Sequence, residues 1–137
     1  MLETGEVYLL RDYRNSGADP HFQIVIHKTA TGELVVVYAT TKIEKVKVRC
    51  MLANPKTPYG EISPTYVEIP EGTCGSLPEL CAVNCDNAFL STVEDREAGL
   101  DFSKKEHKLP KEFLDKIVAG IKESFVVPQS VTDALKR

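Results

Sequence analysis

The stretch Gln23–Lys42 places the strongest constraint on the fold, because two runs rich in β-branched residues flank a short polar connection. The runs are residues 23–27 and 34–40, and Thr31-Gly32 lies between them. Val, Ile and Tyr suit a pleated, partly buried surface, and Gly32 can adopt the positive φ that a tight return requires. The pattern predicts a β-hairpin. The uninterrupted apolar run Leu34–Ala39 predicts that the second strand is covered on both faces.

The apolar run ends abruptly at Thr40-Thr41-Lys42, where two hydroxyls and a cation follow one another. Polar groups at the end of a buried strand lie at the edge of a sheet, where side chains meet solvent. We therefore expect any chemistry of this protein near that edge.

The 137 residues predict a single domain that spans 1–137. A hydrophobic content of 42% and a net charge of −3 are ordinary for a globular protein, whereas a dedicated DNA-binding domain is usually basic. No apolar run approaches the ~18 residues of a membrane span. The first ten residues lack the charged start and the long apolar run of a signal peptide, so we expect a cytoplasmic protein.

Further strands are predicted on either side of the hairpin. Residues 5–10 form a short first strand, and residues 11–20 form a charged loop that carries Arg11 and Arg14. Residues 43–52 approximate a period of two, which indicates a half-exposed strand with Lys45, Lys47 and Arg49 on its outer side. Residues 65–69 predict another strand, and 80–93 predict either one bent strand or two short ones.

The C-terminal part has helical patterns. Residues 94–108 are strongly charged and predict an exposed linker. Residues 109–125 carry one apolar stripe at helical spacing, with Pro110 in the first turn. Ser130 and Asp133 resemble the capping box that opens a short last helix.

These elements predict a mainly β protein with a C-terminal helix, of the α+β class. We expect a small, partly open β-barrel of SH3-like type over about residues 1–93, a linker over about 94–108 and a helical segment over about 109–137. A β-sandwich with an appended helix is the alternative.

The four cysteines predict thiols rather than a metal centre. Cys81 and Cys85 have a Cys-x3-Cys spacing, but the repeated CxxC pairs typical of zinc sites are absent from the sequence. We expect buried small side chains and neither a metal nor a cofactor. A zinc-stabilised regulatory domain that uses Cys74, Cys81 and Cys85 is a third, less favoured hypothesis.

Three segments of the chain resemble the MazF/PemK-type toxins. Gly5-Glu6-Val7, residues 23–27 and Val35–Thr41 match, in order and approximate spacing, the family's first strand, its apolar second strand and its third strand that ends in threonine or serine. A late strand followed by a helix also agrees. The sequence departs from the family where an arginine precedes the apolar strand, since Pro20-His21-Phe22 stands there.

The resemblance implies an SH3-like barrel and a metal-independent endoribonuclease that cuts single-stranded RNA. It also implies a homodimer and control by an antitoxin protein. By the same resemblance Thr40 or Thr41 is a functional residue, and His21 is the nearest substitute for the missing arginine.

RNA cleavage without a metal requires a base for the ribose 2′-hydroxyl, an acid for the leaving 5′-oxygen, and donors for the phosphorane charge. His21 is the candidate base or acid, because imidazole titrates near neutral pH. Thr40 and Thr41 are candidate donors to a phosphate oxygen. The candidate RNA-binding residues are Arg11, Arg14, His27, Lys28 and Lys42.

A catalytically inactive module on the same fold, which binds a protein or a nucleic acid, is the alternative function. The missing arginine and the acidic net charge favour it. The sequence contains no P-loop and no GxSxG, HExxH or GxGxxG motif.

Overall fold

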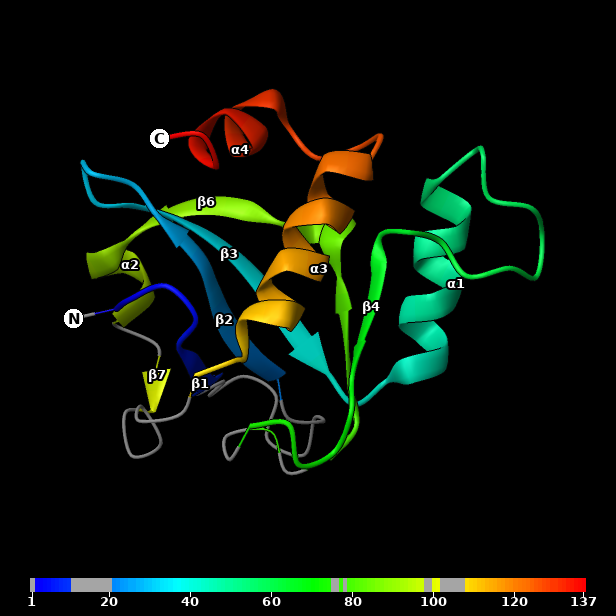
Figure 1. Ribbon diagram of the computed structural model, residues 1–137, viewed down its shortest axis with the longest axis horizontal. Helices are drawn as coiled ribbons and strands as arrows, with labels where there is room; N and C mark the ends of the chain where they lie inside the picture. Colours follow the sequence, from blue (N-terminus) through cyan, green and yellow to red (C-terminus); the bar gives the residue numbers. More distant parts are fainter. Residues whose placement is uncertain (1, 11–20, 75–76, 78, 98–99, 102–107) are drawn as a thin grey trace.

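The computed structural model describes residues 2–10, 21–74, 77, 79–97, 100–101 and 108–137. They form one antiparallel sheet with helices on both of its faces (Figure 1). The strands are β1 (Val7–Leu10), β2 (His21–Lys28), β3 (Glu33–Thr40), β4 (Tyr66–Ile69), β5 (Cys81–Asn84), β6 (Phe89–Thr92) and β7 (Leu100–Asp101). The helices are α1 (Ile43–Ala53), the 3-10 turn η1 (Cys85–Asn87), α2 (Val93–Glu97), α3 (Lys111–Glu123) and α4 (Gln129–Ala134).

The predicted hairpin is the centre of the sheet. β2 and β3 pair along their whole length, from His21 opposite Thr40 to Lys28 opposite Leu34, and Gly32 turns the chain with φ +88°. The side chains of β3 alternate between two apolar clusters, so the expected burial on both faces is confirmed. Tyr38 is the exception, because 37% of its surface is exposed.

The second edge of β3 pairs with two consecutive strands. β5 lies beside the end of β3, and β6 lies beside its beginning, with η1 between them. Of the two alternatives for residues 80–93, one bent strand or two short ones, the structure shows two short strands. Asn84 at the end of β5 and Asn87 in η1 both lie near Thr40, whereas Asp86 is buried.

The sheet does not close into a barrel. Its strands follow the order β4-β5-β3-β2-β1-β7, with β6 beside β3, and the two outermost strands do not pair within the described part of the chain. The α+β class is confirmed. β4 has four residues and β7 has two, so neither outer strand offers a long edge for pairing.

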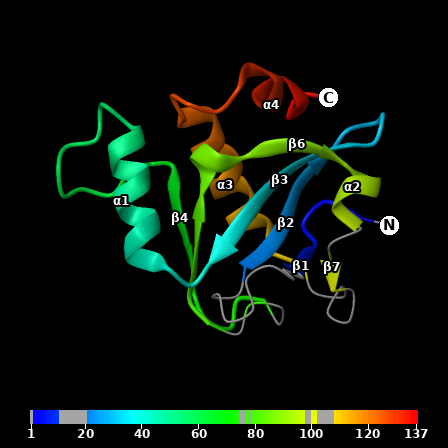
Figure 2. The same ribbon diagram turned by 180° about the vertical axis from the view of Figure 1, so that it is seen from behind.

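The two long helices cover opposite faces of the sheet. α3 packs through Phe113, Ile117 and Ile121 on the face formed by Val35, Val37 and neighbouring residues. α1 packs through Val46 and Cys50 on the opposite face, against Tyr66 and Ala82. Figure 2 shows the sheet from behind, with α3 on its far side.

The prediction of a strand over 43–52 is wrong, since these residues form α1. Ile43, Val46 and Cys50 follow one another at intervals of three and four, which places them on one helical face against the sheet. Val48 and Leu52, which a strand would have turned inward, are 49% and 73% exposed. The apolar residues of this segment fit the strand period and the helical period in part. The helix forms because it packs Val46 and Cys50 against the sheet.

The C-terminal helices are confirmed with different ends. α3 covers Lys111–Glu123, within the predicted 109–125, and Pro110 is its N-cap. α4 begins after Pro128 without a side-chain capping bond, so the capping box at Ser130 is wrong. The range predicted as a charged linker contains α2 and β7 among its described residues. No helix in the described ranges is both long and apolar enough to cross a membrane.

Candidate functional site

The end of β3 leads directly into α1 through Thr40, Thr41 and Lys42. The Lys42 N–H donates a hydrogen bond to the Thr40 Oγ1 at 3.3 Å, and the Ile43 N–H donates to the Thr41 carbonyl at 3.0 Å. Because the Thr40 oxygen already accepts this bond, its own proton remains able to donate to a ligand. The turn therefore presents a hydroxyl donor at the end of the strand.

A cavity of about 170 Å³ opens beside Thr40, between the sheet and α1. Tyr38 and Thr40 contribute to it as neighbours on one face of β3, and Arg49 contributes from α1. Its lining residues are Tyr38, Thr40, Val46, Arg49, Asn84 and Asn87. No carboxylate is among them, so the cavity combines one cation with neutral hydrogen-bonding groups. Such a lining suits an anionic or strongly polar ligand.

The amide of Asn84 is fixed by two neighbours. Its Oδ1 accepts hydrogen bonds from the Asp86 N–H at 2.9 Å and from the Cys50 thiol at 3.3 Å. With the oxygen occupied in this way, the amide nitrogen is the group of Asn84 that can donate to a ligand. Burial raises the pKa of Cys50 to about 11, so its thiol stays neutral and serves as a donor rather than as a nucleophile.

An aromatic and cationic cluster borders the cavity at Tyr38. The rings of Tyr38 and Phe89 lie 5.2 Å apart, and the Arg96 guanidinium lies 5.1 Å from the Phe89 ring centroid. Arg96 Nη1 also donates a hydrogen bond of 2.7 Å to the Tyr38 hydroxyl. The cluster holds the Tyr38 ring in a defined position at the mouth of the cavity. A partly exposed ring that is held in this way can stack on a nucleobase.

Gln23 lies opposite Tyr38 on the neighbouring strand. Its side chain is fully buried, and neither its Nε2 nor its Oε1 has a hydrogen-bond partner in the described part of the chain. A buried amide without partners lowers the stability of the fold.

His21 begins β2 directly opposite Thr40, which ends β3. The two predicted residues are thus adjacent in the antiparallel ladder, at the end of the hairpin away from the Gly32 turn. The pairing fixes the backbone positions of His21 and Thr40. The ladder therefore places the backbones of His21 and Thr40 side by side at this end of the hairpin.

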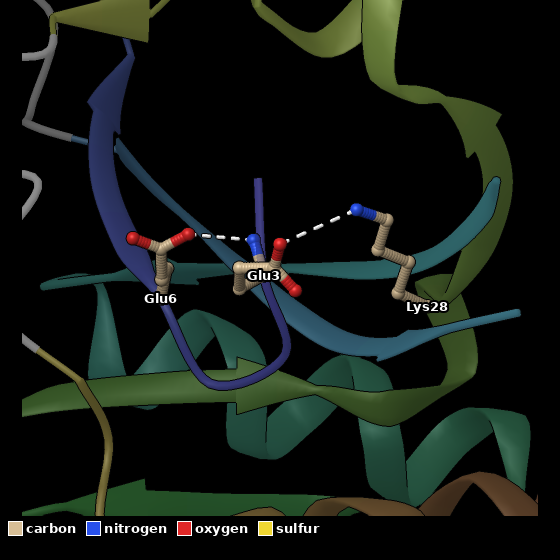
Figure 3. Close-up of polar contacts among 3 residues, drawn as sticks. All are labelled: Glu3, Glu6 and Lys28. Atoms are coloured by element: carbon tan, nitrogen blue, oxygen red, sulfur yellow. Dashed lines mark hydrogen bonds and ion pairs between the residues drawn. The ribbon is translucent and has the colours of Figure 1, made fainter. Parts of the chain in front are cut away.

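The other predicted RNA-binding residues lie elsewhere or outside the described ranges. His27 and Lys28 are at the opposite end of β2, roughly 20 Å from His21 at about 3.3 Å per residue. Lys28 Nζ forms an ion pair of 3.4 Å with Glu3, next to the turn closed by Glu6 (Figure 3). Lys42 is exposed at the start of α1, close to Thr40.

Arg11 and Arg14 lie outside the residues that the structure describes. Thr41 is half-buried and does not line the cavity, whereas Thr40 does. Of the two threonines, the geometry therefore favours Thr40.

Sequence reasoning missed Arg49, Asn87 and Tyr38, and it interpreted Asn84 as part of a bend rather than of the site. Arg49 was interpreted as part of a solvated strand face, because residues 43–52 were assigned the wrong period. A helical interpretation places Arg49 three residues after Val46, on the side that meets the sheet. The two asparagines carried a usable signal, since they interrupt an apolar segment between two strands.

The described cysteines Cys50, Cys74, Cys81 and Cys85 are all buried and free. Among the described residues no group of three or more His, Cys, Asp or Glu side chains is arranged to hold a metal ion. Neither a protein-family model nor a curated protein matches this sequence.

Proposed function

We propose that the cavity beside Thr40 binds a phosphate of single-stranded RNA and that the protein is a metal-independent endoribonuclease of MazF/PemK-like type. The observation that carries the proposal is the convergence of Thr40, Arg49 and Asn84 on one cavity that has no carboxylate in its lining. These groups supply hydroxyl, guanidinium and amide donors for the non-bridging oxygens of a phosphodiester. Tyr38 offers a ring for an adjacent base.

Arg49 can take the place of the arginine that the family pattern has before the apolar strand and that this sequence lacks. The arginine expected before the apolar strand is replaced in the segment Pro20-His21-Phe22. Arg49 brings a guanidinium to the same strand end from α1, a different element. We propose that it stabilises the charge of the pentacoordinate phosphorane in place of the missing residue.

The proposed reaction is an internal transfer that needs no metal. The ribose 2′-oxygen loses its proton to a base and forms a bond to phosphorus, and the bond to the 5′-oxygen breaks. The 5′-oxygen takes up a proton from an acid, so the products are a 2′,3′-cyclic phosphate and a 5′-hydroxyl. His21 is the proposed base or acid, on the basis of its position opposite Thr40.

The resemblance supplies the rest of the proposal. It includes a relationship of the sheet to SH3-like barrels, a homodimer as the active form, a cytoplasmic location and control by an antitoxin protein. Co-expression of that antitoxin should relieve the growth arrest that the protein causes alone.

An RNA-cleavage assay in excess EDTA tests the proposal. The wild-type protein should cut a labelled single-stranded RNA and leave 2′,3′-cyclic phosphate ends. His21→Ala, Thr40→Val and Arg49→Gln should each reduce the cleavage rate by at least tenfold while the circular dichroism spectrum is unchanged. Lys45→Gln removes a cation of α1 that does not line the cavity, and it serves as the control.

The inactive binding module is the second candidate. It is favoured by the absence of the expected arginine in the Pro20-His21-Phe22 segment. In that case the purified protein leaves RNA uncut in the same assay but retains it in a filter-binding measurement, and Arg49→Gln weakens the retention. Cleavage that EDTA abolishes would contradict the proposed metal-independent mechanism.

A further inference from the structure

β4 is an outermost strand of the sheet, and no other strand pairs with its outer edge within the described residues. The Cys85 N–H donates a hydrogen bond of 2.9 Å to the Thr65 carbonyl, just before β4 begins. In an antiparallel ladder the backbone groups of alternate residues point to the same neighbour. Val67 therefore points its N–H and carbonyl to β5.

By the same alternation, Tyr66 and Glu68 point their backbone groups to the outer edge. The Tyr66 N–H already donates a hydrogen bond of 3.1 Å to the Ser63 carbonyl. The Tyr66 carbonyl and the N–H and carbonyl of Glu68 remain for a partner outside the described chain. These three groups are spaced as an added strand requires.

A groove of about 450 Å³ runs between this edge and α3. Tyr66, Val67 and Glu68 all line it, although consecutive strand residues point to opposite faces. A hollow along the edge of the strand accounts for contact with all three. On the helix side, the small residues Ala119 and Gly120 leave room for an incoming side chain.

The groove continues into a second hollow of about 290 Å³ beyond the start of β4. The two hollows share Ile62, Pro64 and Glu123. Ile62 is 63% exposed and Phe125, in the second hollow, is 53% exposed. Exposed apolar side chains beside an open strand edge are typical of a surface that binds an extended segment.

The charges of the groove select for a basic partner. Glu68 and Glu123 line it, and neither carboxylate forms an ion pair with a described residue. Lys116, the cation on the helix side, has its Nζ 5.0 Å from the centroid of the Phe113 ring. Two carboxylates on either side of one groove favour a lysine or arginine side chain between them.

We propose that the groove between β4 and α3 binds an extended basic peptide segment of a partner protein, which adds to the sheet as a strand beside β4. The backbone of the peptide pairs with Tyr66 and Glu68, an apolar side chain enters the space beside Ala119, and a lysine or arginine lies between Glu68 and Glu123. The groove shares no lining residue with the cavity beside Thr40, so this inference stands independently of the RNA proposal.

A second copy of the chain is a poorer occupant. A two-fold pairing of β4 with itself would bring the Glu68 and Glu123 carboxylates of both copies together across one short interface. Like charges placed opposite one another weaken a strand pair.

The test uses the full-length protein and fluorescein-labelled nine-residue peptides in which Val alternates with Lys. A second set replaces Lys by Glu, and a third set carries N-methyl groups on alternate backbone nitrogens. Fluorescence anisotropy gives the affinities, and amide NMR shifts locate the binding site. The Val/Lys peptides should bind, protect the Glu68 N–H from hydrogen exchange and shift the signals of β4 and α3.

The Glu peptides should bind at least tenfold more weakly than the Val/Lys peptides. At least one of the N-methylated peptides should show the same loss, because its methyl groups replace the N–H groups that pair with β4. Glu68→Lys and Glu123→Lys should each weaken the Val/Lys peptide by at least fivefold, and Ala119→Trp should block the groove. Glu112→Lys changes the same charge on the exposed part of α3 outside the groove and should leave the affinity unchanged.

Three results would overturn the proposal. They are the absence of binding by every Val/Lys peptide, equal binding of all N-methylated copies, and amide shifts confined to other elements. A dimer in sedimentation velocity that dissociates in Ala119→Trp would overturn it as well, because a second copy would then occupy the groove.

Discussion

Thr40 of β3 and Arg49 of α1 line the same cavity, although one ends a strand and the other lies on a helix that was expected to be a strand. The turn at Lys42 reverses the chain so that α1 packs back over the strand end, with Val46 against the sheet. The relationship gives a hydroxyl and a guanidinium access to one ligand. It is the geometric basis of the proposed site.

Replacing Arg49 by Gln should weaken RNA binding. The guanidinium is the cation in the lining of the cavity, so its loss removes about one phosphate contact. The slope of log Kd against log salt should fall by about 1, as expected for one released counterion. Filter binding over a range of salt measures both effects. Lys45→Gln should leave the slope at the wild-type value, and an equal loss in the two variants would argue for a diffuse electrostatic effect instead.

Replacing Gln23 by Met should stabilise the fold. The amide is fully buried and lacks hydrogen-bond partners among the described residues, whereas Met has nearly the same volume without the polar atoms. We expect the free energy of unfolding to rise by about 1–2 kcal/mol. Urea denaturation followed by circular dichroism measures it. A lower stability in the variant would mean that the amide has a partner in the folded chain.

Replacing Gly120 by Ala should destabilise the protein, although Ala is the better helix former. A β-carbon at this position would lie 2.7 Å from the Cys85 Sγ and 3.0 Å from the Pro64 carbonyl oxygen. Separating α3 from the sheet to relieve this overlap should cost about 1–3 kcal/mol.

Thermal denaturation of Gly120→Ala, of the double variant Gly120→Ala/Cys85→Ala and of Ala119→Ser checks this reasoning. Gly120→Ala should lower the stability less in the Cys85→Ala variant than in the wild type, because the sulfur that the added β-carbon would meet is then absent. Ala119→Ser alters an exposed neighbour and should stay within about 0.5 kcal/mol of the wild type. An unchanged stability in Gly120→Ala would show that helix and sheet are not in close contact there.

Replacing Asp86 by Ala should also lower stability. The Asp86 carboxylate accepts a hydrogen bond of 2.9 Å from the Thr65 hydroxyl and one of 2.6 Å from the Ser124 hydroxyl, which links η1 to β4 and to the end of α3. Its removal leaves two donors without their acceptor and should cost about 2–4 kcal/mol. A double-mutant cycle with Ser124→Ala measures how much the hydrogen bond between Ser124 and Asp86 contributes to the free energy of unfolding. Additive effects of the two substitutions would contradict the link.

Buried thiols should make the protein less stable at alkaline pH. Burial raises the pKa of Cys50 and of Cys81 from 9.0 to about 11. Between these values the unfolded chain releases thiol protons that the folded chain retains, so the free energy of unfolding falls as pH rises. The thiols' contribution is complete below about pH 9 and lost above about pH 11.

Urea denaturation at several pH values measures this dependence. The variant Cys50→Ala/Cys81→Ala should show a shallower decline of stability between about pH 9 and 11 than the wild type. An identical slope in the two proteins would mean that other groups govern the decline.

The local patterns of the chain predicted a large part of its fold. Gly32 and the two flanking β-branched runs predict the hairpin, because the chain must reverse there to bury both runs. The stripe from Phe113 to Ile121 predicts α3 for a similar reason, since one period matches its apolar residues. The segment from Ile43 to Leu52 misled the prediction, because its apolar residues fit both periods in part.

The candidate site was predicted only where neighbouring residues in sequence remain neighbours in space. Thr40 was found because it ends an apolar strand. Arg49 and Asn87 were missed, because α1 and η1 bring them to Thr40 through tertiary packing, and Asn84 reaches Thr40 through the pairing of β5 with β3. His27 and Lys28 were grouped with His21 along one strand, yet the length of β2 places them at its other end.

The sequence by itself determined the hairpin, the C-terminal helices and the hydroxyl at the end of β3, since hydrophobic periodicity and turn residues act over a few neighbouring positions. Only the tertiary structure decided that the sheet stays open, that residues 43–53 form a helix and that Arg49 reaches Thr40. Those outcomes depend on which surfaces pack against one another, and a burial pattern that fits two periods can be resolved only by the partner that covers it.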